Sequence, residues 1–154
     1  MNVETLISIE IIAIYISSET QLKYLRMAIA LHTPTQAPDQ ANAVLTRATC
    51  EAAQRLSIKG SELATILGVS PATVTRMKQQ TYTLSPDSKA WELAVLLVRL
   101  YRSLDSITNG DENTARAWMH NPNEHLHGIP IALTQKVDGL SRTLAYVDAF
   151  RAPI

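Results

Sequence analysis

The stretch SELATILGVSPATVTRMKQ, residues Ser61 to Gln79, decides the fold class of this chain. Its apolar residues have the spacing of two short helices that cross steeply and face each other; they are Leu63, Leu67, Val69, Val74 and Met77. The small side chain of Ala64 allows close approach, and Gly68 readily adopts the positive φ that ends a first helix. Ser70 and Pro71 are typical of the N-cap and first position of a second helix. The pattern therefore predicts a helix-turn-helix.

The second helix of this motif would carry a polar face off its apolar stripe, as a recognition helix in the DNA major groove does. The residues of that face are Ala72, Thr73, Thr75, Arg76, Lys78 and Gln79. Arg76 and Gln79 are the first candidates for base contacts, since Arg pairs with guanine and Gln with adenine, each pair giving about 1–3 kcal/mol of discrimination. Ser70, Lys78 and Lys59 are candidates for phosphate contacts. Two ordinary packed helices with a solvated face are the alternative.

The charge of the chain is balanced in total but uneven along its length. With 14 basic and 14 acidic residues the net charge is zero, which argues against bulk attraction to nucleic acid. Between Arg55 and Arg102, seven basic residues stand against three acidic ones, so this segment carries +4 and the remainder −4. The positive segment contains the predicted helix-turn-helix. This asymmetry predicts modest, salt-sensitive DNA binding by a dimer.

Cysteine content and the N-terminus indicate a cytoplasmic protein. The single cysteine, Cys50, excludes an intramolecular disulfide, and its place in a helical pattern favours a small buried side chain over a reactive thiol. The N-terminus lacks a basic region, and Glu4 and Glu10 interrupt its apolar stretch, so we expect no secretory signal. No run approaches the ~20 apolar residues that span a bilayer.

Residues 1–38 are expected to form an N-terminal extension and linker. The first 33 residues are rich in isoleucine, and their pattern leaves strand and helix open. An apolar strip of this kind is most simply buried against its twin in a homodimer. Alternatively, translation begins at Met27 and the upstream part contributes little. The prolines of TPTQAPD, Thr33 to Asp39, predict a linker, with Asp39 as a cap for the next helix.

Beyond the linker the periodicity predicts only helices, and therefore an all-α fold. A first helix to about Leu56 and the helix-turn-helix make up a DNA-binding region at 39–84. The first helix has one apolar side, formed by Val44, Leu45, Ala48, Ala52 and Leu56. A long core helix is expected from Pro86, capped by Ser85, to about Ile107, within a second region at 85–154. Shorter helices follow from Asp111, near 130 and after 139.

The C-terminal third, ARAWMHNPNEHLHGIPIALTQKVDGLSRTLAYVDAF, resembles the toxin-binding domain of the Xre/MbcA/ParS family of antitoxins. The matching positions are Trp118, Pro122, Asn123, Leu126, Gly128, Pro130, Leu133, Gly139, Leu144 and Val147. The helix-turn-helix and the stretch KAWELAVLLVRLYRSLDSITNG resemble the same family, so the resemblance spans about Asn42 to Phe150. Two positions depart from it: His127 stands where a small residue is common, and Thr134 replaces a frequent leucine. Residues 1–32 have no counterpart.

The resemblance implies an antitoxin of a type II toxin-antitoxin system whose partner is a RES-domain toxin, an NAD-consuming enzyme. In that family the antitoxin covers the entrance to the NAD pocket with its C-terminal region and represses its own operon as a dimer. Periodicity favours the core for Trp118 and Val147. Large or charged residues near the C-terminus are the candidates for toxin contact: Arg142, Tyr146, Phe150, Arg151, Ala152, Pro153 and Ile154.

Other functions find less support in the sequence. His120, His125 and His127 lack the paired spacing of a zinc site, which favours solvated loop histidines over a metal centre. No phosphate-binding loop or catalytic triad is evident, so we expect neither an enzyme nor a cofactor. A helix-turn-helix regulator that senses a small ligand, and an adaptor that has lost DNA binding, remain open. A neighbouring reading frame for a RES-type protein distinguishes the antitoxin from the sensor.

Overall fold

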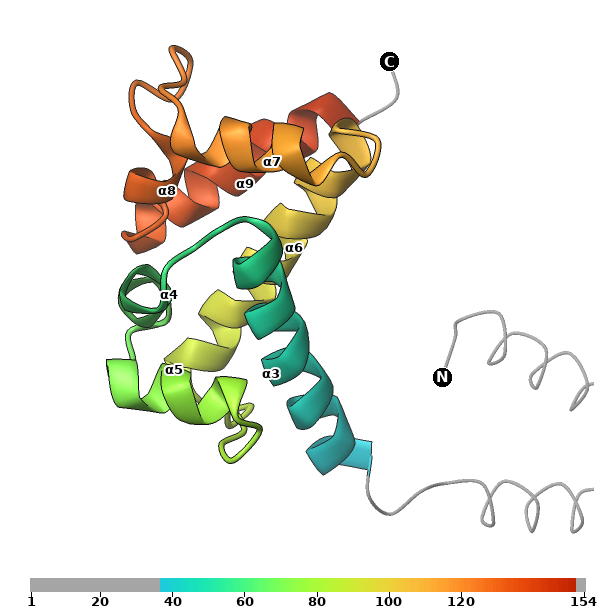
Figure 1. The fold of residues 1–154 in the computed structure, drawn as a ribbon, viewed down its shortest axis with the longest axis vertical. Coiled ribbons are helices and arrows are strands. Elements are labelled where there is room, and N and C mark those ends of the chain that lie inside the picture. The colour runs from blue at the N-terminus through green and yellow to red at the C-terminus, as the bar shows by residue number, and fades with distance from the viewer. Residues whose placement is uncertain (1–36, 152–154) are drawn as a thin grey trace, which may run out of the picture. The chain divides into compact units, whose positions relative to one another are not determined.

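The computed structural model describes residues 37–151, with side chains from 41 to 150. This part of the chain is helical, with one isolated antiparallel bridge between Asn123 and Gly128, so the predicted all-α class is confirmed (Figure 1). The helices are α3 (Ala37–Arg55), α4 (Gly60–Leu67), α5 (Pro71–Lys78), α6 (Lys89–Ile107), α7 (Glu112–His120), α8 (Pro130–Leu133) and α9 (Val137–Arg151). The described residues from Pro38 onward form one compact unit. The expectations for residues 1–33 and for a start at Met27 lie outside the described residues.

Helix α6 is the central helix of the core, as predicted. Four of its apolar side chains are fully buried: Ala94, Leu97, Leu100 and Leu104. It packs against α9 along much of its length and also contacts α4 and α7. Figure 1 shows α3, α4 and α5 around one end of α6 and α7, α8 and α9 around the other. A single buried cluster joins residues of both groups, so α6 links them through one apolar core. None of the described helices has the length and apolar character needed to cross a membrane.

The predicted start of α6 at Pro86 is wrong, because the cap lies three residues further on. Ser88 is the N-cap, and its Oγ accepts a hydrogen bond from the Trp91 amide at 3.2 Å. Ser85 and Pro86 instead form a turn, closed by the Ser88 amide, which donates to the Ser85 carbonyl at 3.0 Å. The serine that caps α6 is therefore Ser88, three residues after the predicted Ser85.

Helix α3 is rotated relative to the apolar side that its sequence suggests. Val44 was expected to be packed and is 60% exposed, whereas Thr46 and Thr49 are buried. Both threonine hydroxyls donate to carbonyls one turn back, and Thr46 Oγ1 also accepts from the Leu84 amide at 3.0 Å. Because these hydroxyls are satisfied, two polar residues occupy core positions without the cost of an unpaired group. The helix also begins at Ala37, before Asp39.

Helix α9 is one helix of 15 residues that begins before Gly139, not a short helix after it. Gly139 lies in its first turn, where it meets the C-terminal end of α8. A Cβ at this position would lie 2.1 Å from the carbonyl oxygen of Leu133. The glycine is therefore present because the two helices approach closely, and it does not break α9.

Polar contacts hold two of the C-terminal helices, α9 and α7, onto the rest of the described unit. On α9, Asp148 accepts from the buried Ser103 hydroxyl at 2.5 Å and pairs with Arg99 at 3.2 Å, both on α6. On α7, Arg116 Nε donates to the Arg55 carbonyl at 2.7 Å, and His120 Nε2 lies 3.0 Å from the Leu56 carbonyl. These contacts satisfy carbonyls at the C-terminal end of α3 and fix the orientation of α7 against the helix-turn-helix half.

Candidate DNA-binding and toxin-binding surfaces

The turn between α4 and α5 has the geometry that the sequence predicts for a helix-turn-helix. Gly68 has φ 65°, in the left-handed region, and the Val69 amide bonds back to the Ala64 carbonyl at 3.0 Å. Ser70 is the N-cap of α5, and its Oγ accepts from the Thr73 amide at 3.1 Å. Pro71 is the first helical residue. Local sequence signals thus determine both ends of the turn.

The packed and exposed faces of α5 largely follow the predicted pattern. Val74 and Met77 are 2% exposed, in contact with the buried leucines of α4. Five of the six residues predicted on the polar face are exposed: Ala72, Thr75, Arg76, Lys78 and Gln79. These five side chains, with Gln79 at the C-cap, form the outer face of α5.

The prediction that Thr73 also lies on the exposed face is wrong. Thr73 is 8% exposed, and its Oγ1 lies 2.9 Å from Ser70 Oγ. As the third residue of α5 it sits directly over the N-cap, so its side chain folds against the first turn. Its hydroxyl also accepts a hydrogen bond from Arg76 Nη2 at 3.2 Å. Thr73 therefore belongs to the internal contacts of α5.

Arg76, the first candidate for base contact, is exposed but held in place. Its Cζ lies 5.2 Å from the centroid of the Tyr82 ring, a cation–π contact, and its Nη2 donates to Thr73. Tyr82 lies in the loop after α5 and was missed from the sequence. The chain turns back at Gln80, where φ is 59°, and this turn brings Tyr82 beside α5. A spacing of six residues does not match the helical repeat, so periodicity does not predict that Tyr82 contacts Arg76.

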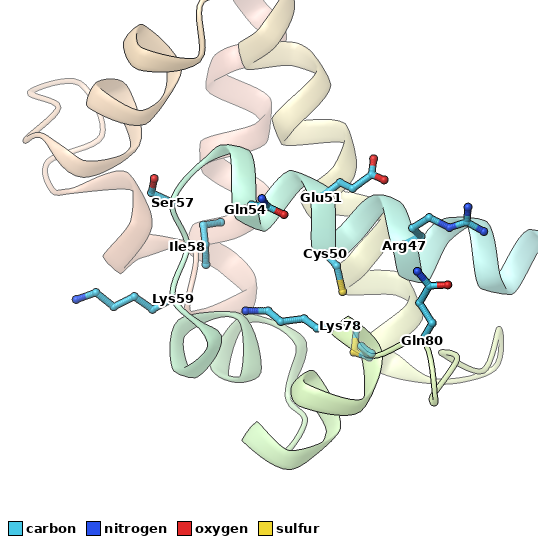
Figure 2. Close-up of a pocket in the computed structure, with 10 residues that line it drawn as sticks. Arg47, Cys50, Glu51, Gln54, Ser57, Ile58, Lys59, Lys78 and Gln80 are labelled. Atoms are coloured by element: carbon cyan, nitrogen blue, oxygen red, sulfur yellow. The ribbon is translucent and has the colours of Figure 1, made fainter.

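An open groove of about 560 Å³ lies between α3 and α5, beside the outer face of α5. Lys59, Lys78 and Arg47 line it, and Arg47 was not among the predicted residues. Figure 2 shows Lys59 and Lys78 extending in the same direction, while Glu51, the one carboxylate of the lining, points away from α5. Among the side chains described, no carboxylate forms an ion pair with these three cations. The groove is therefore positively charged, as phosphate contacts require.

Cys50 points from α3 toward α5 in this groove and is half-buried (Figure 2). Burial raises the pKa of the thiol, outweighing the opposite effect of Lys78. Because the thiolate is the nucleophile, we expect Cys50 to react with a disulfide reagent at pH 7.5 more slowly than free cysteine does. Stopped-flow absorbance with the full chain, compared with the urea-unfolded chain, measures this rate. Equal rates in both states would contradict the prediction.

The C-terminal half presents an aromatic cluster formed by Trp118, His125, Tyr146 and Phe150. Tyr146 is at its centre: its ring centroid lies 6.4 Å from Trp118, 5.9 Å from His125 and 5.0 Å from Phe150. Phe150 is 63% exposed, whereas Tyr146 and Trp118 are half-buried. Val147 is fully buried, as predicted. His125 was not predicted to belong here.

The other residues predicted for toxin contact lie around the aromatic cluster or beyond it. Arg142 is exposed on α9. Arg151 is the last helical residue, and its side chain is outside the described residues, as are Ala152, Pro153 and Ile154. The structure therefore describes the side chains of three of the seven predicted residues, and all three are on α9.

The three histidines have separate environments, and His120 lies at the end of α7, not in a loop. His120 contacts the end of α3 and His125 stacks on Tyr146. Within residues 41–150, no three His, Cys, Asp or Glu side chains are placed to hold one metal ion. His127 has φ 54°, in the left-handed region, which residues with a Cβ seldom adopt.

Two family models match the chain in sequence. The antitoxin Xre-like helix-turn-helix domain matches residues 36–99, and the antitoxin Xre/MbcA/ParS C-terminal toxin-binding domain matches residues 103–152. A search among curated proteins finds no match for the chain. The two matches follow each other within α6 and together extend over all the helices described above. The chain belongs to the Xre/MbcA/ParS family of antitoxins, with a helix-turn-helix domain followed by a toxin-binding domain.

Proposed function

We propose that this antitoxin binds a RES-domain toxin, an NAD-consuming enzyme, covers its active site, and represses its own operon through α5. The observation that carries the proposal is the placement of two partner surfaces on one body. Figure 1 shows α5 at one end of the helical unit that α3 to α9 form and the C-terminal end of α9 at the other. The two matched domains are a helix-turn-helix domain and a toxin-binding domain, which supports a role in binding. The separation would allow toxin and DNA to bind together.

The aromatic cluster is the proposed anchor for the toxin. It lies within the segment matched by the toxin-binding domain, and its most exposed member, Phe150, is followed directly by the C-terminal tail. Aromatic side chains that are held by their neighbours bury large apolar areas at little entropic cost, and such residues often dominate binding energy. Tyr146 holds Phe150 in an edge-to-face contact, so Phe150 is presented for binding in a fixed orientation.

The outer face of α5 is the proposed reader of operator DNA. Arg76 and Gln79 would contact bases, with Ala72 and Thr75 against the groove floor, whereas Ser70, Lys59 and Lys78 would contact phosphates. Arg47 on α3 extends the positive surface beside α5. The zero net charge of the chain makes this local surface the main source of DNA affinity.

Replacing Arg76 by Ala is expected to weaken operator binding about tenfold or more and to relax base preference at one position. The reason is the loss of a planar donor pair that suits guanine. Fluorescence anisotropy with a duplex selected by the full chain from a random library measures both effects. Arg102→Ala is the matched control, because Arg102 is an exposed arginine of α6 outside both surfaces. If Arg76→Ala bound as tightly as the parent chain, the adaptor without DNA binding would be favoured.

A homodimer is proposed because an operator reader of this size gains affinity and specificity from two half-sites. The isoleucine-rich segment before Met27 is the proposed interface. A chain that begins at Met27 is expected to sediment as a monomer at concentrations where the full chain sediments as a dimer. Sedimentation velocity makes the comparison. Dimers retained by the shorter chain would rule out this segment as the interface.

Co-expression tests the proposal as a whole. The chain is produced with the product of the neighbouring gene, and copurification and growth are measured. Rescue of growth by a chain that copurifies with a RES-type protein is the expected result. A neighbour of another kind, together with operator binding that changes when a small ligand is added, would support a ligand-responsive regulator instead.

A further inference from the structure

We infer that Thr73 and Tyr82 position the guanidinium of Arg76 for base reading, so that one residue of α5 and one of the loop after it determine DNA specificity through a third. The inference rests on the proposed DNA binding by α5. It assigns to Thr73 a positioning role in place of the direct contact expected from its sequence position, and it gives a role to Tyr82, which no sequence pattern singled out.

Two contacts of different kinds fix the Arg76 head group. The hydrogen bond from Nη2 to Thr73 Oγ1, at 3.2 Å, holds one edge of the guanidinium. The Tyr82 ring, 5.2 Å from Cζ, holds its position from another side. With a single contact, the guanidinium could still change its orientation by rotation about the bonds of the Arg76 side chain. Together the two contacts restrict the orientation of the fork that reads a base.

The groups that hold Arg76 are themselves fixed by packing. Thr73 is 8% exposed, and its hydroxyl lies 2.9 Å from Ser70 Oγ, which also accepts from the Thr73 amide as the cap of α5. Tyr82 is half-buried and packs against the apolar core. The orientation of Arg76 is therefore tied to the cap at one end of α5 and to the loop at the other.

Both holding groups are electrically neutral, which distinguishes Arg76 from the three described arginines that are held by carboxylates. Arg55, Arg99 and Arg116 each pair with a carboxylate. A carboxylate would neutralise the guanidinium and occupy two donors at once. Thr73 occupies one of the five N–H donors, and the ring face occupies none. Arg76 thus keeps its charge and most of its donors available for DNA while its freedom of rotation is already reduced.

The expected effect follows from the cost of ordering a long side chain on binding. A pre-oriented arginine avoids much of this cost, so loss of either contact should weaken specific binding about two- to tenfold. Non-specific binding depends on charge, which these substitutions leave unchanged, and should be unaffected. A purely structural role would instead lower the melting temperature and weaken both kinds of binding together.

The test uses the full chain and a duplex that it selects from a random library, with a scrambled duplex for non-specific binding. Thr73→Val removes the hydroxyl that accepts from Arg76 and keeps the shape of the side chain, whereas Thr73→Ser keeps a hydroxyl. Tyr82→Leu removes the aromatic ring, whereas Tyr82→Phe keeps it. Arg76→Ala gives the full loss for reference. Affinity for both duplexes, discrimination against single-base changes, and the melting temperature are measured for each variant.

The inference is supported if specific binding and discrimination fall two- to tenfold in Thr73→Val and Tyr82→Leu. Thr73→Ser and Tyr82→Phe should bind and discriminate as the parent chain does. Parent-like discrimination in both Thr73→Val and Tyr82→Leu, while Arg76→Ala loses it, would overturn the inference and leave the proposed DNA binding intact. A parent chain that selects no sequence would instead overturn the proposed function. If Tyr82→Leu melts below the assay temperature, the isosteric pair at Thr73 decides.

Discussion

Removing residues Phe150 to Ile154 is expected to abolish toxin neutralisation and to leave operator binding unchanged. The deletion takes away the most exposed member of the aromatic cluster together with the tail that follows it. It leaves Val147 and Asp148, the residues that pack α9 on α6, in place. Growth of cells that co-express the toxin measures neutralisation, and anisotropy with the selected duplex measures DNA binding. A truncated chain that still protects the cells would contradict the proposed toxin surface.

A pair of single substitutions on α9 separates this surface from the rest of the helix. Phe150 and Val137 are both 63% exposed, but they lie at opposite ends of α9. Phe150→Ala is expected to weaken toxin binding by roughly 30-fold, about 2 kcal/mol, as at other aromatic hot spots. Val137→Ala, the matched control, should bind as the parent chain does. Equal effects of the two substitutions would show that exposed apolar area alone drives binding.

Gly139→Ala is expected to destabilise the protein by about 3 kcal/mol. The added Cβ would lie 2.1 Å from the Leu133 carbonyl oxygen, which is backbone and has no room to move unless α8 and α9 separate. Gly60→Ala is the control, because the nearest atom to its Cβ would be the tip of Lys78, at 3.8 Å. Thermal unfolding followed by circular dichroism measures both. A Gly139→Ala variant that melts with the parent chain would contradict the close contact between α8 and α9.

The helix-turn-helix could be predicted from the sequence because its signals are local. Gly68 ends α4 with a positive φ, and Ser70 with Pro71 begins α5, as the order of these residues indicates. The same holds for Asp111, whose side chain accepts from the Asn113 amide at the start of α7. Capping depends on a few neighbouring residues, so the sequence contains all the information needed.

The features that were missed depend on contacts that helical periodicity does not predict. Thr46 is buried because its hydroxyl meets the Leu84 amide, 38 positions away, and this contact turns Val44 outward. In the sequence Gly139 indicates a helix boundary, but in the structure it lies within α9 beside the Leu133 carbonyl. Tyr82 reaches Arg76 only through a turn with positive φ at Gln80. In each case tertiary contact overrides a local preference.

The central claim is that one helical body carries a DNA-reading helix at one end and a toxin-binding helix end at the other. Hydrogen–deuterium exchange of the full chain tests it most directly, with the selected duplex and the neighbouring toxin added separately and then together. The account predicts protection of α4 and α5 by DNA, protection of the C-terminal turns of α9 by toxin, and both patterns when both partners are present. The claim would be contradicted if both partners protected the same segment. It would also be contradicted if a toxin that binds the chain gave no protection of α9.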